Sequence, residues 1–227
     1  MMNSTKLQSR GIAKVDIDGA RALSLDLIRA LQDSIDQAED TGATGALVLH
    51  VAGATGQGTP RSWPGRTDVQ SVSKWERAMR RLERSDLVTV ALVEGTCSAL
   101  ALELLLVVDR RISCRDFCAR HVCQECRVWP GMALYRLSRQ IGEVRARKLY
   151  LDATPLTTSK ALELNLIDEV VDDFTTGMAR ISNFLEVAPV DDFAVRRRLM
   201  QESLSTGFDE ALGAHLAACD RAIRSSE

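Results

Sequence analysis

Glu103 is the residue whose type and surroundings most directly suggest chemistry. It is the one charged residue within 98–108, a segment that is otherwise apolar apart from Ser98. Carboxylates are almost never fully buried unless they are paired or functional. A carboxylate in a buried helix can transfer protons, so Glu103 is a candidate catalytic acid or base. The structural alternative is an ion pair with an arginine, for which Arg110 and Arg111 are nearby candidates.

The six cysteines are a second group with chemical potential. Four of them lie close together in the sequence, with His121 among them: Cys114, Cys118, Cys123 and Cys126. Their spacing lacks the long insertion that separates the two ligand pairs of common zinc ribbons. We therefore expect no metal at this cluster, and we interpret these cysteines as small, partly buried hydrophobic residues.

The elements that must position Glu103 can be inferred on both sides of it. Residues 87–93 form a short apolar run rich in β-branched side chains, which indicates a buried strand. Gly95 then marks a turn, and residues 98–108 are predicted to form a buried helix with Ser98 as its N-cap. A further strand follows at Ile112.

The preceding segments favour a parallel α/β arrangement. A strand is predicted at 12–18, a helix from Ser24 to about Asp40, and a buried strand at 46–51. Residues 52–68 form a Gly- and Pro-rich connection that is longer than usual for an α/β fold, which suggests function or mobility.

Helices dominate the rest of the predicted structure. The helix at 69–84 should bury Trp75, Met79 and Leu82, while its arginines form a basic face that is either simply solvated or binds phosphates. Further helices are predicted near 131–142, at 143–151, at 190–205 and at 208–224.

Composition excludes several classes of function. The 227 residues suffice for one α/β domain with a sizeable core. A net charge of −2 gives no electrostatic argument for a nucleic-acid partner. No apolar run approaches the ~18 residues of a membrane helix, so no membrane partner is expected. The first ten residues lack the apolar core of a signal peptide, so we expect a cytoplasmic protein with reduced thiols.

The segment around Glu103 resembles the crotonase (enoyl-CoA hydratase/isomerase) superfamily. Val93-Glu94-Gly95 is similar to the family's Val-Asn-Gly, Glu103 falls where its first catalytic Glu falls, and residues 152–171 match a second family segment. The resemblance implies an α/β spiral of repeated strand–strand–helix units in residues 1–171. It also implies a trimerising helical region in 172–227, a CoA thioester as substrate, and no cofactor beyond the CoA of that substrate.

The resemblance also implies roles for individual residues. The backbone N–H groups of Arg66 and Leu100 fall at the family's oxyanion hole. A second acid/base group would lie near His121, Cys123 or Glu125. The sequence departs from the family here, because Ala-Leu-Ala replaces the glycine run before Glu103 and no second Glu stands in the family's Pro-Glu setting.

Residues 72–84 and 129–137 are similar to small crotonase-like proteins of the dihydroxyphenylacetyl-CoA pathway, which makes dihydroxyphenylglycine in glycopeptide-antibiotic producers. This resemblance implies dehydration or isomerisation of a polyketide-derived CoA thioester, in support of a type III polyketide synthase that makes 3,5-dihydroxyphenylacetyl-CoA. The alternative is a non-catalytic accessory subunit that binds the synthase or its CoA-linked product. A homotrimer or a dimer of trimers is the implied assembly.

Overall fold

The computed structural model describes residues 11–41, 44–55, 58–120, 129–152, 155–187 and 192–224. Its main element is a five-stranded sheet in which every neighbouring pair of strands is parallel. The strand order is β1 (Gly11–Asp18), β2 (Thr44–Ala52), β3 (Val88–Glu94), β5 (Arg110–Cys114) and β8 (Glu169–Val171). The α/β class with a parallel sheet that the sequence predicted is therefore confirmed.

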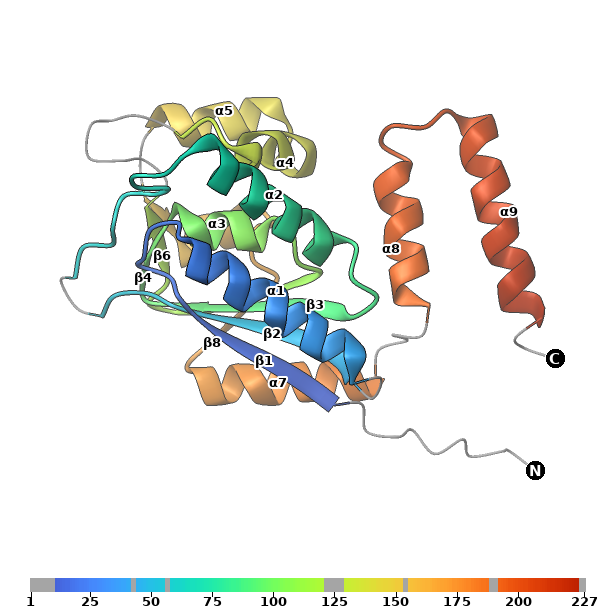
Figure 1. Cartoon of the computed structure of the whole chain (residues 1–227), viewed down its shortest axis with the longest axis horizontal. Coiled ribbons are helices and arrows are strands. Elements are labelled where there is room, and N and C mark those ends of the chain that lie inside the picture. The colour runs from blue at the N-terminus through green and yellow to red at the C-terminus, as the bar shows by residue number, and fades with distance from the viewer. Residues whose placement is uncertain are drawn as a thin grey trace.

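Helices cover both faces of this sheet (Figure 1). One face carries α1 (Leu25–Asp40), α2 (Val69–Glu83) and α3 (Ala99–Leu105), and the other carries α7 (Phe174–Val187). Because both faces are covered, the central strands are apolar along almost their whole length, and in β3 only the terminal Glu94 is less than fully buried.

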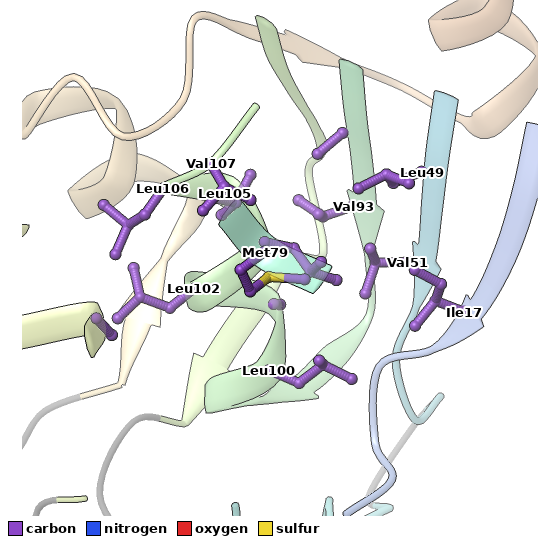
Figure 2. Close-up of a cluster of buried hydrophobic side chains, with 14 of the residues drawn as sticks. Ile17, Leu49, Val51, Met79, Val93, Leu100, Leu102, Leu105, Leu106 and Val107 are labelled. Atoms are coloured by element: carbon purple, nitrogen blue, oxygen red, sulfur yellow. The ribbon is translucent and has the colours of Figure 1, made fainter. Parts of the chain in front are cut away.

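The larger hydrophobic core lies between the sheet and α1, α2 and α3. Figure 2 shows part of it, where side chains of β1, β2 and β3 meet Met79 of α2 and leucines of α3. A smaller core lies beneath the sheet, where Ile181 and Leu185 of α7 pack against residues such as Val90 and Leu92. Together the two cores make the sheet a rigid support for α3.

Local signals predicted the first helix correctly. The side chain of Ser24 accepts a hydrogen bond from Leu27 N at 3.2 Å and caps α1, and the apolar face of α1 is buried. The same is true of α2, which begins after Asp68, whose carboxylate accepts from Ser71 N at 2.7 Å.

A second, smaller sheet contains the strand that directly precedes α3, the helix that carries Glu103. Its order is β4 (Thr96–Ser98), β6 (Cys118–Arg120) and β7 (Leu156–Thr157). Gly95 adopts φ +67° between β3 and β4, a conformation that favours glycine, and a Cβ there would lie only 3.1 Å from Ala54 O. The turn therefore brings β4 against the start of the 52–68 connection, where Ala54 and Thr96 exchange two backbone hydrogen bonds.

The helix that carries Glu103 is shorter than predicted. The sequence predicted a helix over 98–108 with Ser98 as its N-cap. Ser98 is indeed the N-cap of α3 and also the last residue of β4, but α3 ends at Leu105. After Leu105 the last helical turn is tighter, because Val107 N donates to Leu104 O. Two residues later the chain has reached the sheet, where Asp109 N donates to Thr89 O of β3. An apolar run does not show where a helix must stop so that the chain can re-enter the sheet.

Three further helices close the side of the molecule near α3. They are α4 (Met132–Ile141), α5 (Glu143–Asp152) and α6 (Thr158–Glu163). Gly142 separates α4 from α5 at φ +81°, and Asn165, which follows α6, adopts φ +55°, as expected for an asparagine that replaces a C-terminal glycine.

The last helices are α8 (Phe193–Glu202) and α9 (Phe208–Arg224), which stand beside the main body in Figure 1. Arg197 anchors α8 to the body, whereas α9 has no buried residue. Within the described part of the chain, no helix combines the length and the apolar character needed to cross a membrane. The division of the chain at residue 171 stays a prediction.

Candidate functional site

Glu103 lies in the middle of α3 and is almost completely buried, with 2% of its surface exposed. Its neighbours in the helix are leucines and alanines, all buried except the half-buried Ala99, and they pack in the core beside the sheet. The sequence predicted this burial. A carboxylate in such a position needs hydrogen-bond donors, because an unsatisfied buried charge is very unfavourable.

Two tryptophans supply those donors. Trp63 Nε1 donates to Glu103 Oε1 at 2.9 Å, and Trp75 Nε1 donates to Glu103 Oε2 at 2.5 Å. The two indole rings meet edge to face, with centroids 5.4 Å apart. Trp63 comes from the 52–68 connection and Trp75 from α2, so three separate segments converge on one carboxylate.

These surroundings make Glu103 titrate near neutrality. Burial raises its pKa to about 7, and the charge of Glu76 acts in the same direction. The hydrogen bonds from Trp63 and Trp75 and the charge of Arg136 oppose the increase in pKa. A carboxyl group with a pKa near the working pH is suited to both accepting and returning a proton.

A buried ion-pair network holds α2 in place next to Glu103. Arg136 of α4 is buried, and its guanidinium contacts Glu76 at 2.9 Å and Glu83 at 2.8 Å, both on α2. The two carboxylates raise the pKa of Arg136, while burial opposes them, so the side chain stays charged. By joining α2 to α4, this network fixes the helix that carries Trp75.

The start of α4 approaches Glu103 closely. A Cβ at Gly131 would lie 3.3 Å from Glu103 Oε1 and 2.5 Å from Trp129 Nε1, so glycine is needed there for space. Tyr150 of α5 is close enough for the charge of the same carboxylate to affect its pKa. Burial, with a contribution from the charge of Glu103, raises the pKa of the Tyr150 phenol to about 12.

The two predicted oxyanion-hole donors have different surroundings. Leu100 is fully buried in the first turn of α3, and its N–H donates to Ser98 Oγ over a long 3.3 Å. Arg66 lies in the 52–68 connection and is exposed. The adjoining chain is held in place, because Leu23 N donates to Pro64 O at 3.0 Å. The roles of Arg66 and Leu100 stay predictions.

The structure corrects one prediction about Glu103. Arg110 and Arg111 were its candidate ion-pair partners, but Arg110 pairs with Glu169 at 2.8 Å and Arg111 pairs with Asp168 at 3.0 Å. Both arginines belong to β5, beyond the end of α3, and their side chains contact carboxylates that follow α6.

The predicted second acid/base candidates, His121, Cys123 and Glu125, lie outside the described residues. Of the cysteine cluster, Cys114 is buried and Cys118 is half-buried. Burial raises the pKa of the Cys114 thiol to about 12, which suits a small hydrophobic residue rather than a metal ligand or nucleophile. Cys123 and Cys126 lie outside the described residues, so the absence of a metal at this cluster stays a prediction.

Carboxylates neutralise much of the predicted basic face of α2. Arg81 pairs with Asp36 and Glu39, and Arg80 contacts Glu83 at 3.2 Å. Arg77 and Arg84 remain exposed. A phosphate on this helix would therefore meet a smaller positive charge than the sequence suggests.

Trp63, Trp75 and Tyr150 were not predicted from the sequence as neighbours of Glu103. Trp75 was predicted only as one of the apolar residues of its helix. A usable signal was present, because a buried indole N–H normally needs an acceptor and a buried carboxylate needs donors. The chain has only three tryptophans, so few pairings had to be considered.

Comparisons with known proteins identify the family of the chain. The profile of the enoyl-CoA hydratase/isomerase family matches residues 8–217. A protein of Amycolatopsis orientalis named enoyl-CoA-hydratase is 41% identical over 208 residues, which cover 92% of this chain and 94% of that protein.

Solved structures share the fold at low identity. An enoyl-CoA hydratase of Shewanella pealeana superposes with a TM-score of 0.78 at 19% identity, covering 96% of this chain and 86% of that one. A protein of Pseudomonas aeruginosa gives 0.74 at 24% identity, covering 95% and 99%. The predicted crotonase-type fold is thus confirmed, and the chain belongs to the enoyl-CoA hydratase/isomerase family.

Proposed function

We propose that this protein dehydrates or isomerises a polyketide-derived CoA thioester, in support of a type III polyketide synthase that makes 3,5-dihydroxyphenylacetyl-CoA. The observation that carries the proposal is the state of Glu103, a buried carboxyl group whose pKa is about 7. Such a group can change its protonation state under physiological conditions at little cost. The pathway rests on the resemblance of residues 72–84 and 129–137 described above.

One carboxylate is sufficient for isomerisation. Ionised Glu103 would remove a proton from the carbon next to the thioester carbonyl, and the electron pair would move onto the carbonyl oxygen. The N–H groups of Arg66 and Leu100 would stabilise that oxyanion. If the acyl group carries a double bond between its β- and γ-carbons, the product of this step is a dienolate. Protonated Glu103 would then return the proton to the γ-carbon, the electron pair would leave the carbonyl oxygen, and the double bond would move to the α- and β-carbons. The protein needs no cofactor beyond the CoA of its substrate, and it would act in the cytoplasm.

A second candidate function is that of an accessory subunit which binds the synthase or its CoA-linked product without chemistry of its own. A specific observation favours it, because both oxygens of Glu103 are already hydrogen-bonded to Trp63 and Trp75. In this arrangement the carboxylate would be a structural acceptor for two buried indoles.

The C-terminal helices support a homotrimer or a dimer of trimers. The exposed apolar side chains of these helices and of the segment between them are Met200, Leu204, Phe208, Leu212, Leu216 and Ile223. Isolated exposed apolar residues are ordinary, but so many along one helix pair are typical of a surface that another subunit covers. A particle mass of one 25.0 kDa chain at micromolar concentration would contradict the assembly.

Product analysis with a single variant separates the two functions. Malonyl-CoA is incubated with the synthase alone, with the synthase and this protein, and with the synthase and Glu103→Gln. If Glu103 transfers protons, the variant should bind CoA thioesters but lose about 10²–10⁴-fold in its effect on the rate of product formation. Glu163→Gln, an exposed position paired with Lys160, is the control and should keep full activity. A folded Glu103→Gln protein with full activity would select the accessory function.

A further inference from the structure

The two hydrogen bonds to Glu103 come from supports of different rigidity. Trp75 lies within α2, is 2% exposed, and belongs to a helix that Arg136 ties to α4. Trp63 lies outside any helix or strand, is 6% exposed, and directly follows the exposed Ser62. Trp75 therefore cannot leave Glu103 without unpacking a helix, whereas Trp63 lies at the edge of the core.

The backbone on both sides of Trp63 is nevertheless fixed. Arg61 N donates to Ala20 O at 2.8 Å, and Leu23 N donates to Pro64 O at 3.0 Å. These two bonds join the 52–68 connection to the segment between β1 and α1. Because the backbone is held on both sides, displacement of the indole from Glu103 has to occur by rotation about its own side-chain bonds, between staggered conformers.

Proton transfer requires that one oxygen of Glu103 face the acyl group, yet each oxygen already accepts a hydrogen bond from an indole. We propose that Trp63 is a positioning residue that holds Glu103 Oε1 in the free protein and is displaced by the acyl group of a bound CoA thioester, while Trp75 retains Oε2. This inference rests on the proposed function. It adds that binding of the CoA thioester frees one oxygen of Glu103 to act as the base.

The chemical consequence follows from the loss of one donor. The hydrogen bond from Trp63 stabilises the ionised form of Glu103 and so lowers its pKa. When the indole leaves, the carboxylate loses that stabilisation and becomes a stronger base next to the acyl group. Trp75 keeps the remaining oxygen oriented, so the freed oxygen points in a defined direction.

The chain offers a direct spectroscopic test, because it contains only three indole N–H groups. In nitrogen-15-labelled protein without ligand, the Trp63 and Trp75 signals should follow the ionisation of Glu103 with a midpoint near pH 7. Both signals should stop titrating in Glu103→Gln. Added acetoacetyl-CoA should then shift the Trp63 signal strongly and leave the Trp75 signal close to its position in the ionised free protein.

Two matched variants give a second readout. Trp63→Phe removes the competing donor, so acetoacetyl-CoA should bind about tenfold more tightly in calorimetry, since a hydrogen bond to a charged group no longer has to be broken. Trp75→Phe removes the retained donor and should bring no such gain. Both changes should raise the midpoint at which the remaining indole signal titrates, because each removes a bond to the carboxylate.

The outcomes separate this inference from the proposed function. If acetoacetyl-CoA binds but the Trp63 signal does not move, or if Trp63→Phe binds no more tightly than the unmodified protein, displacement is wrong and the proposed function stands. If acetoacetyl-CoA does not bind at all, both are wrong. The measurements on the unmodified protein need no variant, so a misfolded Trp63→Phe protein would still leave the displacement testable.

Discussion

Two buried carboxylates lie close together in the sequence, and the protein stabilises them in different ways. Glu103 of α3 receives hydrogen bonds from two neutral indoles. Asp109, just before β5, contacts the guanidinium of Arg197 at 2.6 Å, and each of these two side chains is 8% exposed. Thr89 adds two more hydrogen bonds to the same oxygen of Asp109, from its backbone N at 2.8 Å and its hydroxyl at 2.9 Å.

The kind of partner decides what a buried carboxylate can do. A cation compensates the charge of Asp109, and the pair connects α8 to the sheet, so its role is structural. Neutral donors only partly offset the burial of Glu103, and its pKa is raised to about 7. Burial alone therefore does not identify a catalytic carboxylate. Burial without a direct ion pair is what raises the pKa of Glu103 towards neutrality.

Removing the cation from the structural pair should have the largest effect. Arg197→Ala leaves Asp109 buried without its counter-charge and removes the guanidinium bonds to the carbonyl oxygens of Ser85 and Leu87. We expect the free energy of unfolding to fall by about 3–5 kcal/mol, measured by urea denaturation.

The neighbouring Arg198 provides the control for this change. It pairs with Glu202 on the exposed surface of α8 at 2.9 Å, so Arg198→Ala should cost at most about 0.5 kcal/mol. Equal losses for Arg197→Ala and Arg198→Ala would show that the buried pair has no special importance.

The second prediction concerns Glu103 and pH. Its pKa is raised from 4.5 to about 7 on folding, so between these values the folded protein holds a proton that the unfolded chain releases. The contribution of Glu103 to stability is therefore fully present below the lower value and is lost as the pH rises through the higher one. The loss should be about 3 kcal/mol between about pH 4.5 and pH 8.

Glu103→Gln isolates this contribution, because glutamine does not titrate. Urea denaturation of both proteins across the same pH range should show the unmodified protein losing its advantage over the variant as the pH rises. Parallel curves for the two proteins would mean that Glu103 keeps an ordinary pKa, and that the contrast with Asp109 is wrong.

The smallest effect should come from a neutral partner of the structural pair. Thr89→Val keeps the shape of the side chain and the backbone N–H but removes the hydroxyl that donates to Asp109 at 2.9 Å. The ion pair with Arg197 remains, so we expect a loss of about 1–2 kcal/mol in thermal or urea unfolding. A loss as large as that of Arg197→Ala would mean that hydrogen bonds, rather than the cation, stabilise Asp109.

Much of the fold could be predicted because its signals are local. Ser24 marked the start of α1, apolar periodicity marked the buried face of α2, and β-branched runs marked the central strands. In the second sheet β4 and β7 were not predicted, because they span only three and two residues. Strands this short have no periodicity of their own and exist only through their partners.

The sequence by itself determined that Glu103 is buried in an apolar helix, and that a helix follows the 52–68 connection. Only the tertiary structure decided which groups meet the carboxylate. Trp63 and Trp75 lie 40 and 28 residues away in sequence, and both indoles reach Glu103 only after the sheet, α2 and α3 have packed together. No local pattern encodes such a meeting, because it depends on long-range packing, and the same packing gave Arg110 and Arg111 other partners.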